Sequence, residues 1–256
     1  MRNLIARAGR ATTAEQTIIE VKRVSSIWAH RGARNGAPEN SMRAFRLARD
    51  LGADGIEFDV RFSDDLVPFV LHDKKLDRTT NEAGPISEVS AAKLAEFGVP
   101  TLAEVLAEFS GEGLTFNMEI KSSRRGAGVV RPLLDVVGDF DIADRCWLSS
   151  FDASVLREVG ARFPTGLLVH RAARRPLRTT AELGCPAIHP HRHLVSPAFM
   201  AKARSRGLRV HPWTVNKVSD IARMVELGAD AIITDLPDLA LQVRGLAQAT
   251  EPGRAR

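Results

Sequence analysis

The sequence predicts an α/β protein, specifically a (β/α)8 barrel of the TIM type. Short apolar runs alternate with amphipathic segments of helical period, and several of these segments end in a glycine just before the next run. The chain has 256 residues, a length that one such barrel fills. Strand–helix alternation favours parallel strands joined by right-handed crossovers. A doubly wound open sheet is the alternative, but no GxGxxG motif opens a helix here.

Nine apolar runs are expected to form strands. They are Ile27–Arg31, Gly55–Arg61, Val67–His72, Thr115–Lys121, Cys146–Ser149, Gly166–His170, Ala187–Pro190, Val210–Thr214 and Ala231–Thr234. One strand is set aside as the partner in a hairpin, which leaves eight, and eight parallel strands close naturally into a barrel.

Amphipathic helices are expected between most of these strands. Ser41–Leu51 and Val218–Leu227 show the pattern clearly, since each carries its apolar residues on a single stripe. Either Asn40 or Ser41 is expected to cap the first of these helices, so neither requires a role in chemistry.

The barrel is expected to occupy residues 25–248. Residues 1–24 are interpreted as a disordered N-terminal tail, and residues 249–256 as a C-terminal tail. Residues 74–100 are polar and too long for an ordinary connection between a strand and a helix. They are expected to form a small insertion after the hairpin, on the face of the barrel where loops vary.

Composition excludes several classes of function. The chain carries 36 Lys and Arg against 31 Asp and Glu, a net charge of +5, and it contains no Tyr. Nucleic-acid binding usually requires clustered basic and aromatic residues, so no nucleic acid is expected, although an anionic substrate would be attracted modestly. No transmembrane segment, disulfide framework or secretory signal is expected, and the predicted location is cytoplasmic. The oligomeric state is not predicted.

The strand at 55–62 carries the first chemical signal. Strand alternation places Glu57, Asp59 and Arg61 on one face and apolar side chains on the other. Two carboxylates so close together repel each other unless positive charge lies between them. Either Arg61 with a second cation supplies that charge, or a metal ion does.

A hairpin would add a histidine to this face. If Asp64–Asp65 forms a two-residue turn, Glu57 lies directly opposite His72. In this register Phe69 and Leu71 join the apolar side.

A third carboxylate comes from the strand at 115–121, where Asn117, Glu119 and Lys121 share a face. Three carboxylates without a nearby cysteine favour Mg²⁺ or Ca²⁺ over Zn²⁺. Lys121 beside the ion would favour an anionic substrate oxygen. The first strand ends in His30-Arg31, which suggests an imidazole for proton transfer and a guanidinium for phosphate recognition.

Six ordered motifs together resemble the glycerophosphodiester phosphodiesterase family, within the wider group of phospholipase C-like barrels. They are His30-Arg31-Gly32, Pro38-Glu39-Asn40, Gly55-Ile56-Glu57-Phe58-Asp59-Val60, Val70-Leu71-His72-Asp73, Leu76-Asp77-Arg78-Thr79-Thr80 and Met118-Glu119-Ile120-Lys121. Downstream segments around Ser150-Phe151, Trp213-Thr214 and Thr234-Asp235 are similar to that family too, so the resemblance extends from about residue 27 to residue 237.

The resemblance implies a metal-dependent barrel that cleaves a small-molecule glycerophosphodiester into glycerol 3-phosphate and an alcohol. It implies roles for eight residues: Glu57, Asp59 and Glu119 as ligands of a divalent cation, Mg²⁺ or Ca²⁺; His30 and His72 as acid and base; Arg31 and Lys121 on the phosphate; and Trp213 against the substrate. Ser41, where Thr is commoner, and the sequence at 81–84 depart from the family pattern without touching these residues.

Two other functions remain open at this point. One is cleavage of a phospholipid, as in lysophospholipase D or sphingomyelinase D enzymes, although no apolar anchor helix is present. The other is a non-catalytic barrel that binds phosphate compounds. The sequence does not determine which histidine is the acid, whether a cyclic phosphate forms first, or which alcohol is released.

Overall fold

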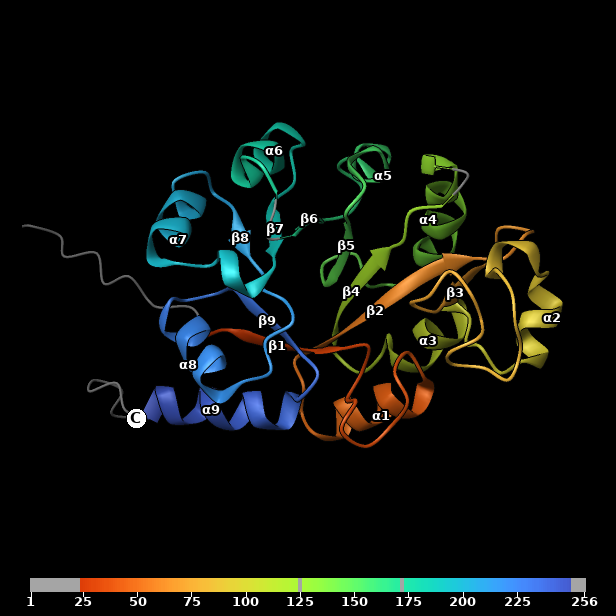
Figure 1. Cartoon of the computed structure of the whole chain (residues 1–256), viewed down its shortest axis with the longest axis horizontal. Helices are drawn as coiled ribbons and strands as arrows, with labels where there is room; N and C mark the ends of the chain where they lie inside the picture. The colour runs from red at the N-terminus through yellow and green to blue at the C-terminus, as the bar shows by residue number, and fades with distance from the viewer. Residues whose placement is uncertain (1–23, 124–125, 171–172, 250–256) are drawn as a thin grey trace, which may run out of the picture.

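The computed structural model describes residues 24–123, 126–170 and 173–249, which form a nearly closed barrel of eight parallel strands. Figure 1 shows the strands at the centre and the helices around the outside. The strands follow one another in the order β8-β7-β6-β5-β4-β2-β1-β9, and β3 pairs only with β2, outside this path. The predicted fold class and the predicted hairpin are therefore confirmed.

The strands are short, as is usual for a barrel. They are β1 (Ser26–His30), β2 (Gly55–Phe62), β3 (Pro68–Val70), β4 (Thr115–Ile120), β5 (Cys146–Ser150), β6 (Thr165–Val169), β7 (Ala187–Pro190), β8 (Arg209–Val210) and β9 (Ala231–Thr234). The structure thus contains a strand in each of the nine predicted runs, and β8 is much shorter than expected.

The α-helices are α1 (Met42–Asp50), α2 (Ala91–Glu96), α3 (Leu102–Phe109), α4 (Val130–Gly138), α5 (Ala153–Val159), α6 (Pro176–Glu182), α7 (Pro197–Arg204), α8 (Val218–Glu226) and α9 (Pro237–Ala249). Among the described residues, three short 3-10 helices lie at Ile86–Glu88, Gly126–Val129 and Arg192–Leu194. Within the described ranges, none of the helices has the length and apolar character needed to cross a membrane.

Backbone hydrogen bonds bring the last strand beside the chain that follows β8. Asp230 N donates to Val210 O at 3.0 Å, and Ile233 N donates to Pro212 O at 3.0 Å. These bonds link residues 210–215 to β9 although β8 itself ends at Val210, so the barrel is nearly closed.

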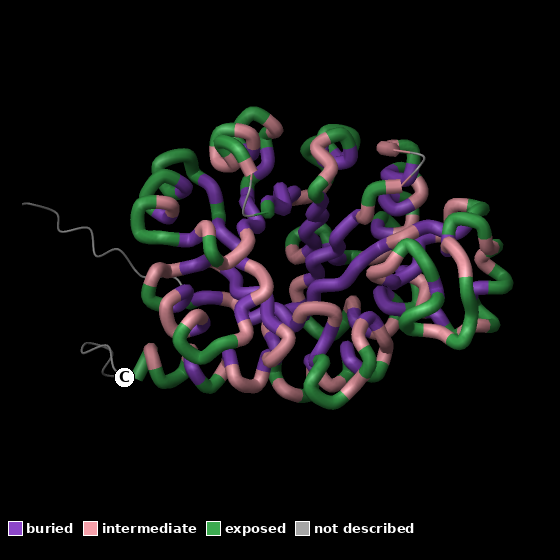
Figure 2. The backbone as a smooth tube through the Cα atoms, viewed as in Figure 1, coloured by how far each residue is buried: buried purple, intermediate pink, exposed green. Residues whose placement is uncertain are grey.

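Two large apolar cores lie between the strands and the surrounding helices, and buried backbone follows the strands in Figure 2. The inside of the barrel holds a separate cluster of rings. His211 lies edge-on to Trp28 and Trp147, with centroid distances of 4.7 and 4.9 Å, and its Nδ1 lies 3.0 Å from the Nε2 of His189. Burial lowers the pKa of His189 to about 3, so this pair is neutral and fills the barrel interior.

Gly166 on β6 makes room for the buried ring of His189. A Cβ atom at Gly166 would lie 2.1 Å from His189 Nε2, and His211 holds that ring in place. We expect Gly166→Ala to lower the free energy of unfolding by about 1–3 kcal/mol, as over-packing of a core does. Urea unfolding followed by circular dichroism measures this difference. Gly138→Ala is the matched control, because a Cβ there meets no atom within 4 Å; equal stability of the two variants would contradict the prediction.

The register predicted for the hairpin is wrong by one residue. Val60 pairs with Val70 and Arg61 with Phe69, so Glu57 is not opposite His72. The loop is one residue longer than expected because Leu66 adopts a left-handed conformation with a φ of 64°, a common way to close a three-residue hairpin loop. This slip moves Phe69 away from the apolar face that it was predicted to share with β2.

Phe69 and Leu71 instead pack into a small core of their own beneath residues 74–100. Its other buried members are Leu76, Ile86, Leu94 and Val99. This segment therefore folds as a compact unit beside the carboxyl end of β2, at the right-hand end of Figure 1 where α2 lies.

Almost all of the two predicted tails lies outside the described residues. Only Val24, an exposed residue, and Ala249, the last residue of α9, belong to the described part of the chain. The tail boundaries and the cytoplasmic location stay predictions from the sequence.

Candidate active site

Three carboxylates meet at the carboxyl ends of β2 and β4. Glu57 and Asp59 lie two residues apart on β2, and the parallel register places Glu119 of β4 directly beside Asp59. One oxygen of each of these buried side chains lies within 4.8 Å of the other two. The alternation read from the sequence therefore brings the three predicted ligands together, from two neighbouring strands.

The cluster has more negative charge than the protein neutralises. Burial, together with the Asp59 and Glu119 carboxylates, raises the pKa of Glu57 well above its usual value. Burial and Asp59 raise the pKa of Glu119 to about 7. Burial would raise the pKa of Asp59 as well, but Lys121 and Arg31 outweigh it and hold that pKa low.

This donor set fits a divalent cation of the hard type. Three carboxylates offer only oxygen ligands, which is the preference of Mg²⁺ and Ca²⁺. Asn117, beside Glu57 in the register, also has a buried Oδ1 that accepts no hydrogen bond from the described residues. A bound cation would relieve the repulsion that raises the carboxyl pKa values.

Lys121 and Arg31 are the cations that contact the cluster. Lys121 Nζ lies 2.6 Å from Asp59 Oδ1 and 2.5 Å from Glu119 Oε1, and Arg31 Nε lies 3.1 Å from Asp59 Oδ2. Arg61, which the sequence left as a candidate for this position, instead donates its Nε to the backbone oxygen of His72 at 2.7 Å.

Asn40 belongs to this cluster, and the prediction that either Asn40 or Ser41 caps α1 is met by Ser41. Ser41 caps α1, because its Oγ accepts a hydrogen bond from Ala44 N at 3.2 Å. Asn40 has a φ of 53° and is buried, and its Nδ2 donates to Asp59 Oδ2 at 2.8 Å. Asn tolerates this left-handed backbone better than most residues, which explains how it can turn toward the carboxylates.

Both predicted histidines lie at the pocket, and each binds a carboxylate through Nδ1. His30 Nδ1 lies 2.7 Å from Asp235 Oδ1, and His72 Nδ1 lies 2.6 Å from Asp73 Oδ1. A carboxylate on Nδ1 fixes the orientation of the ring and leaves Nε2 for other partners. His30 Nε2 lies 3.9 Å from Glu57 Oε2, so this atom faces the carboxylate cluster.

Asp235 was not identified as a site residue from the sequence. It follows β9, and Asn216 Nδ2 donates to its Oδ2 at 2.7 Å. Burial would raise its pKa, but the hydrogen bond to His30 holds the pKa of Asp235 well below its usual range. The family-like sequence Thr234-Asp235 was the available signal, and closure of the barrel places it beside residue 30, since Ala29 pairs with Thr234.

The insertion reaches the site through Arg78. Its Nε lies 2.5 Å from Asp73 Oδ2, and its Nη2 lies 2.6 Å from Glu39 Oε1. Glu39 Oε1 also accepts a hydrogen bond from Arg31 Nη1 at 2.9 Å. Arg78 thus links Asp73, the carboxylate bound to His72, to Glu39, the carboxylate bound to Arg31.

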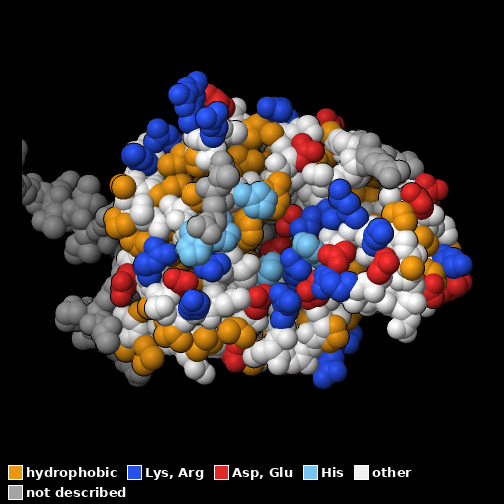
Figure 3. All heavy atoms as spheres, in the orientation of Figure 1, with side chains coloured by type: hydrophobic (Ala, Val, Ile, Leu, Met, Phe, Trp, Pro, Cys, Tyr) orange, Lys and Arg blue, Asp and Glu red, His pale blue; other side chains and the backbone are white. Residues whose placement is uncertain are grey.

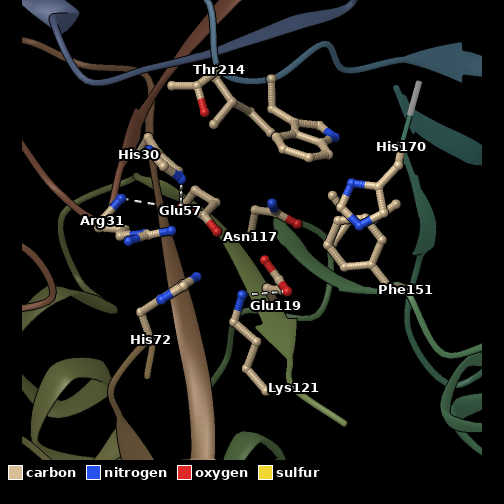
Figure 4. Close-up of a pocket in the computed structure, with 13 residues that line it drawn as sticks. His30, Arg31, Glu57, His72, Asn117, Glu119, Lys121, Phe151, His170 and Thr214 are labelled. Carbon is tan, nitrogen blue, oxygen red and sulfur yellow. Dashed lines mark hydrogen bonds and ion pairs between the residues drawn. The ribbon is translucent and has the colours of Figure 1, made fainter. Parts of the chain in front are cut away.

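A cavity of about 170 Å³ opens above these groups. Figure 4 shows His30, Arg31, His72 and Lys121 on one side and Phe151 with His170 on the other. The rings of Phe151 and His170 stack at 4.2 Å, and Trp213 lies edge-on to Phe151 at 5.6 Å. Trp213 both lines the cavity and packs against the ring cluster inside the barrel. The cavity therefore has a charged side and an aromatic side.

Comparisons with known proteins agree on one family. The sequence profile of the glycerophosphoryl diester phosphodiesterase family matches residues 30–239. A glycerophosphodiester phosphodiesterase of Caldanaerobacter subterraneus is 32% identical over 234 residues, covering 85% of this chain and 96% of that protein. One from Bacillus altitudinis is 31% identical, covering 86% of this chain and 98% of that protein.

Solved structures show the same similarity. A phosphodiesterase of Oleispira antarctica, in complex with the product sn-glycerol 3-phosphate, has a TM-score of 0.79 and 25% identity, covering 86% of this chain and 96% of that chain. A glycerophosphodiester phosphodiesterase of Agrobacterium tumefaciens has a TM-score of 0.72 and 26% identity, covering 85% and 99%.

Proposed function

Because the chain belongs to the glycerophosphoryl diester phosphodiesterase family, we propose that it hydrolyses a glycerophosphodiester to glycerol 3-phosphate and an alcohol. The observation that carries the proposal is the meeting of three buried carboxylates, two cations and two carboxylate-bound histidines around one cavity. The similarity to a phosphodiesterase that binds sn-glycerol 3-phosphate supports this class of substrate.

Glu57, Asp59 and Glu119 would hold Mg²⁺ or Ca²⁺ in this enzyme. The raised pKa values of Glu57 and Glu119 support the assignment, since burial and the neighbouring carboxylates disfavour their negative charge and a divalent ion would balance it. Such an ion supplies neutralising charge to a phosphoryl oxygen.

Arg31 and Lys121 would bind the phosphate group. Both lie at the edge of the carboxylate cluster and line the cavity. Attack on a phosphodiester adds negative charge to its non-bridging oxygens. Fixed cations beside those oxygens therefore stabilise the transition state more than the ground state.

His30 and His72 would move the protons. Asp235 and Asp73 hold their Nδ1 atoms, so each ring can present Nε2 to the substrate. One ring takes a proton from the attacking hydroxyl, of water or of the glycerol itself, and the other gives a proton to the leaving alcohol. Trp213 and Phe151 offer an apolar surface for the carbon skeleton of the substrate.

The test is release of glycerol 3-phosphate from a panel of glycerophosphodiesters, with Mg²⁺, with Ca²⁺ and with EDTA. We expect release with at least one cation and its loss in EDTA. Cleavage of lysophospholipids but of no soluble glycerophosphodiester would contradict the proposed substrate, and binding without any cleavage would indicate a non-catalytic barrel.

Arg78 is expected to contribute by positioning. Substitution Arg78→Gln removes the link between Asp73 and Glu39, so His72 and Arg31 lose a shared support. We expect a decrease in kcat of about 10–100-fold with a smaller change in KM. Residues that orient the contacting side chains of metal-dependent sites have effects of this size. Steady-state kinetics measure it.

Added guanidinium should restore part of the activity of this variant, because the Arg78 side chain is half exposed and the ion can enter the space. Arg46→Gln is the matched control, since Arg46 pairs with Glu108 on the surface. Unchanged kcat in Arg78→Gln would exclude a positioning role.

A further inference from the structure

A second cavity, of about 300 Å³, adjoins the active site on the side of the insertion. Its lining comes from the end of β2, from the insertion and from the loop after β4, and includes Arg61, Lys74, Ser87, Lys121 and Ser122. Lys121 lines both cavities, so the second cavity begins where the phosphate site ends.

Arg61 is the feature that the proposed mechanism does not use. It is partly buried, and the group to which it donates, the backbone oxygen of His72, is neutral. In the described part of the chain no carboxylate lies within ion-pair distance of Arg61, whereas Arg31 and Arg78 in the same region each contact two carboxylates. Asp59, Glu119 and Asp73 attract Arg61 only from beyond ion-pair distance, so an anion bound in the cavity would be the first to contact its guanidinium.

The rest of the cavity has the composition of an anion site. Lys74 adds a second positive charge, and Ser87 and Ser122 add hydroxyl groups at an exposed rim. No Asp or Glu is among the described residues that line it. Figure 3 shows Lys and Arg side chains around the central hollow on the side that faces the insertion.

We propose that this cavity binds an anionic group carried by the leaving alcohol, such as a phosphomonoester, with Arg61 as its principal contact. The inference rests on the proposed function and specifies its substrate class. The two ester substituents of a phosphodiester extend from the phosphorus in different directions. The aromatic side of the first cavity suits the glycerol carbons. The other substituent would then extend past Lys121, which lines both cavities, toward Arg61.

The experiment compares two substrates that differ in one group. They are glycerophosphoglycerol, whose leaving alcohol is neutral, and the same diester with a phosphomonoester on the terminal hydroxyl of that alcohol. We expect the wild-type protein to have a kcat/KM about tenfold higher for the phosphorylated substrate, as one charged hydrogen-bonded contact provides. Arg61→Gln should reduce the ratio of the two kcat/KM values to about one.

Arg61 also donates a hydrogen bond to the backbone oxygen of His72, so Arg61→Gln could lower kcat/KM for both substrates. The ratio of the two kcat/KM values separates charge recognition from such a general loss. Lys74→Gln should lower the ratio by a smaller factor, since Lys74 is exposed. Arg131→Gln is the control for net charge, because Arg131 lies on α4 and pairs with Asp135. It should leave the ratio unchanged.

The outcomes separate the anion site from the phosphodiesterase activity. A wild-type ratio near one, or a ratio that Arg61→Gln does not change, would overturn the anion site while leaving the phosphodiesterase activity established. If inorganic phosphate inhibits cleavage of the neutral substrate in the wild type but not in Arg61→Gln, the cavity takes a free anion and the assignment to the leaving alcohol is wrong. No cleavage of either substrate would count against the proposed function itself.

Discussion

Substitution of Glu119 by Gln is expected to lower kcat/KM by about 10³ or more. The change keeps the shape of the side chain but removes one of three carboxylate charges from the cluster. Divalent ions contribute several kcal/mol of transition-state stabilisation, and each 1.36 kcal/mol corresponds to a factor of ten in rate. Lys121 would also lose one of its two anionic partners and would shift toward Asp59.

The fold should be retained in this variant, because burial and Asp59 disfavour the charge of Glu119 more than Lys121 stabilises it. Burial and the Asp59 carboxylate raise its pKa to about 7, so a neutral amide removes an unfavourable interaction. We expect the melting temperature in EDTA to be unchanged or higher, while calorimetric titration with Mg²⁺ or Ca²⁺ shows weaker binding. Glu112→Gln, on the surface beside Arg49, is the control. Unchanged cation affinity in Glu119→Gln would remove Glu119 from the ligand set.

Replacement of His72 by Ala is expected to slow turnover by about 10²–10⁴, the usual contribution of a general acid or base. His72 lies at the cavity, and burial lowers the pKa of its imidazole below the usual value despite the attraction of Asp59. This lowering favours the neutral form of the ring. Steady-state kinetics on an alkyl glycerophosphodiester measure the loss.

A second substrate identifies the role of each histidine. A p-nitrophenyl diester has a leaving group that needs no proton, so loss of the general acid has little effect on its cleavage. If His72 is the acid, His72→Ala should lose activity on the alkyl diester and retain most of it on the p-nitrophenyl diester, whereas His30→Ala should lose both. The reverse pattern would exchange the two roles. Near-wild-type turnover of His72→Ala on the alkyl diester would remove His72 from the mechanism.

Much of the fold and of the candidate site could be predicted because it depends on local patterns. Strand alternation places Glu57 and Asp59 on one face, and the same rule places Glu119 and Lys121 on one face of another strand. Alternating strands and helices were sufficient to predict the barrel. A barrel of parallel strands brings their carboxyl ends to one side, so these side chains had to meet there.

Local geometry was predicted less well where the backbone leaves the commonly populated regions of φ/ψ space. Leu66 and Asn40 both have positive φ angles, which no pattern in the sequence requires of them. Leu66 lengthens the hairpin loop by one residue and reverses the faces of Phe69 and Leu71. Asn40 donates a hydrogen bond to Asp59, and Ser41, the other of the two expected caps, caps the helix.

Only the tertiary structure decided which distant residues support the site. His30 binds Asp235, 205 positions away, and Arg78 joins Asp73 to Glu39. Arg61 lines a second cavity, whereas Lys121 and Arg31 make the ion pairs with Asp59. By itself the sequence determined which side chains each strand presents, since the periodicity of a strand is local. Pairing across the barrel depends on register and loop conformation, and these are determined by packing of the whole chain.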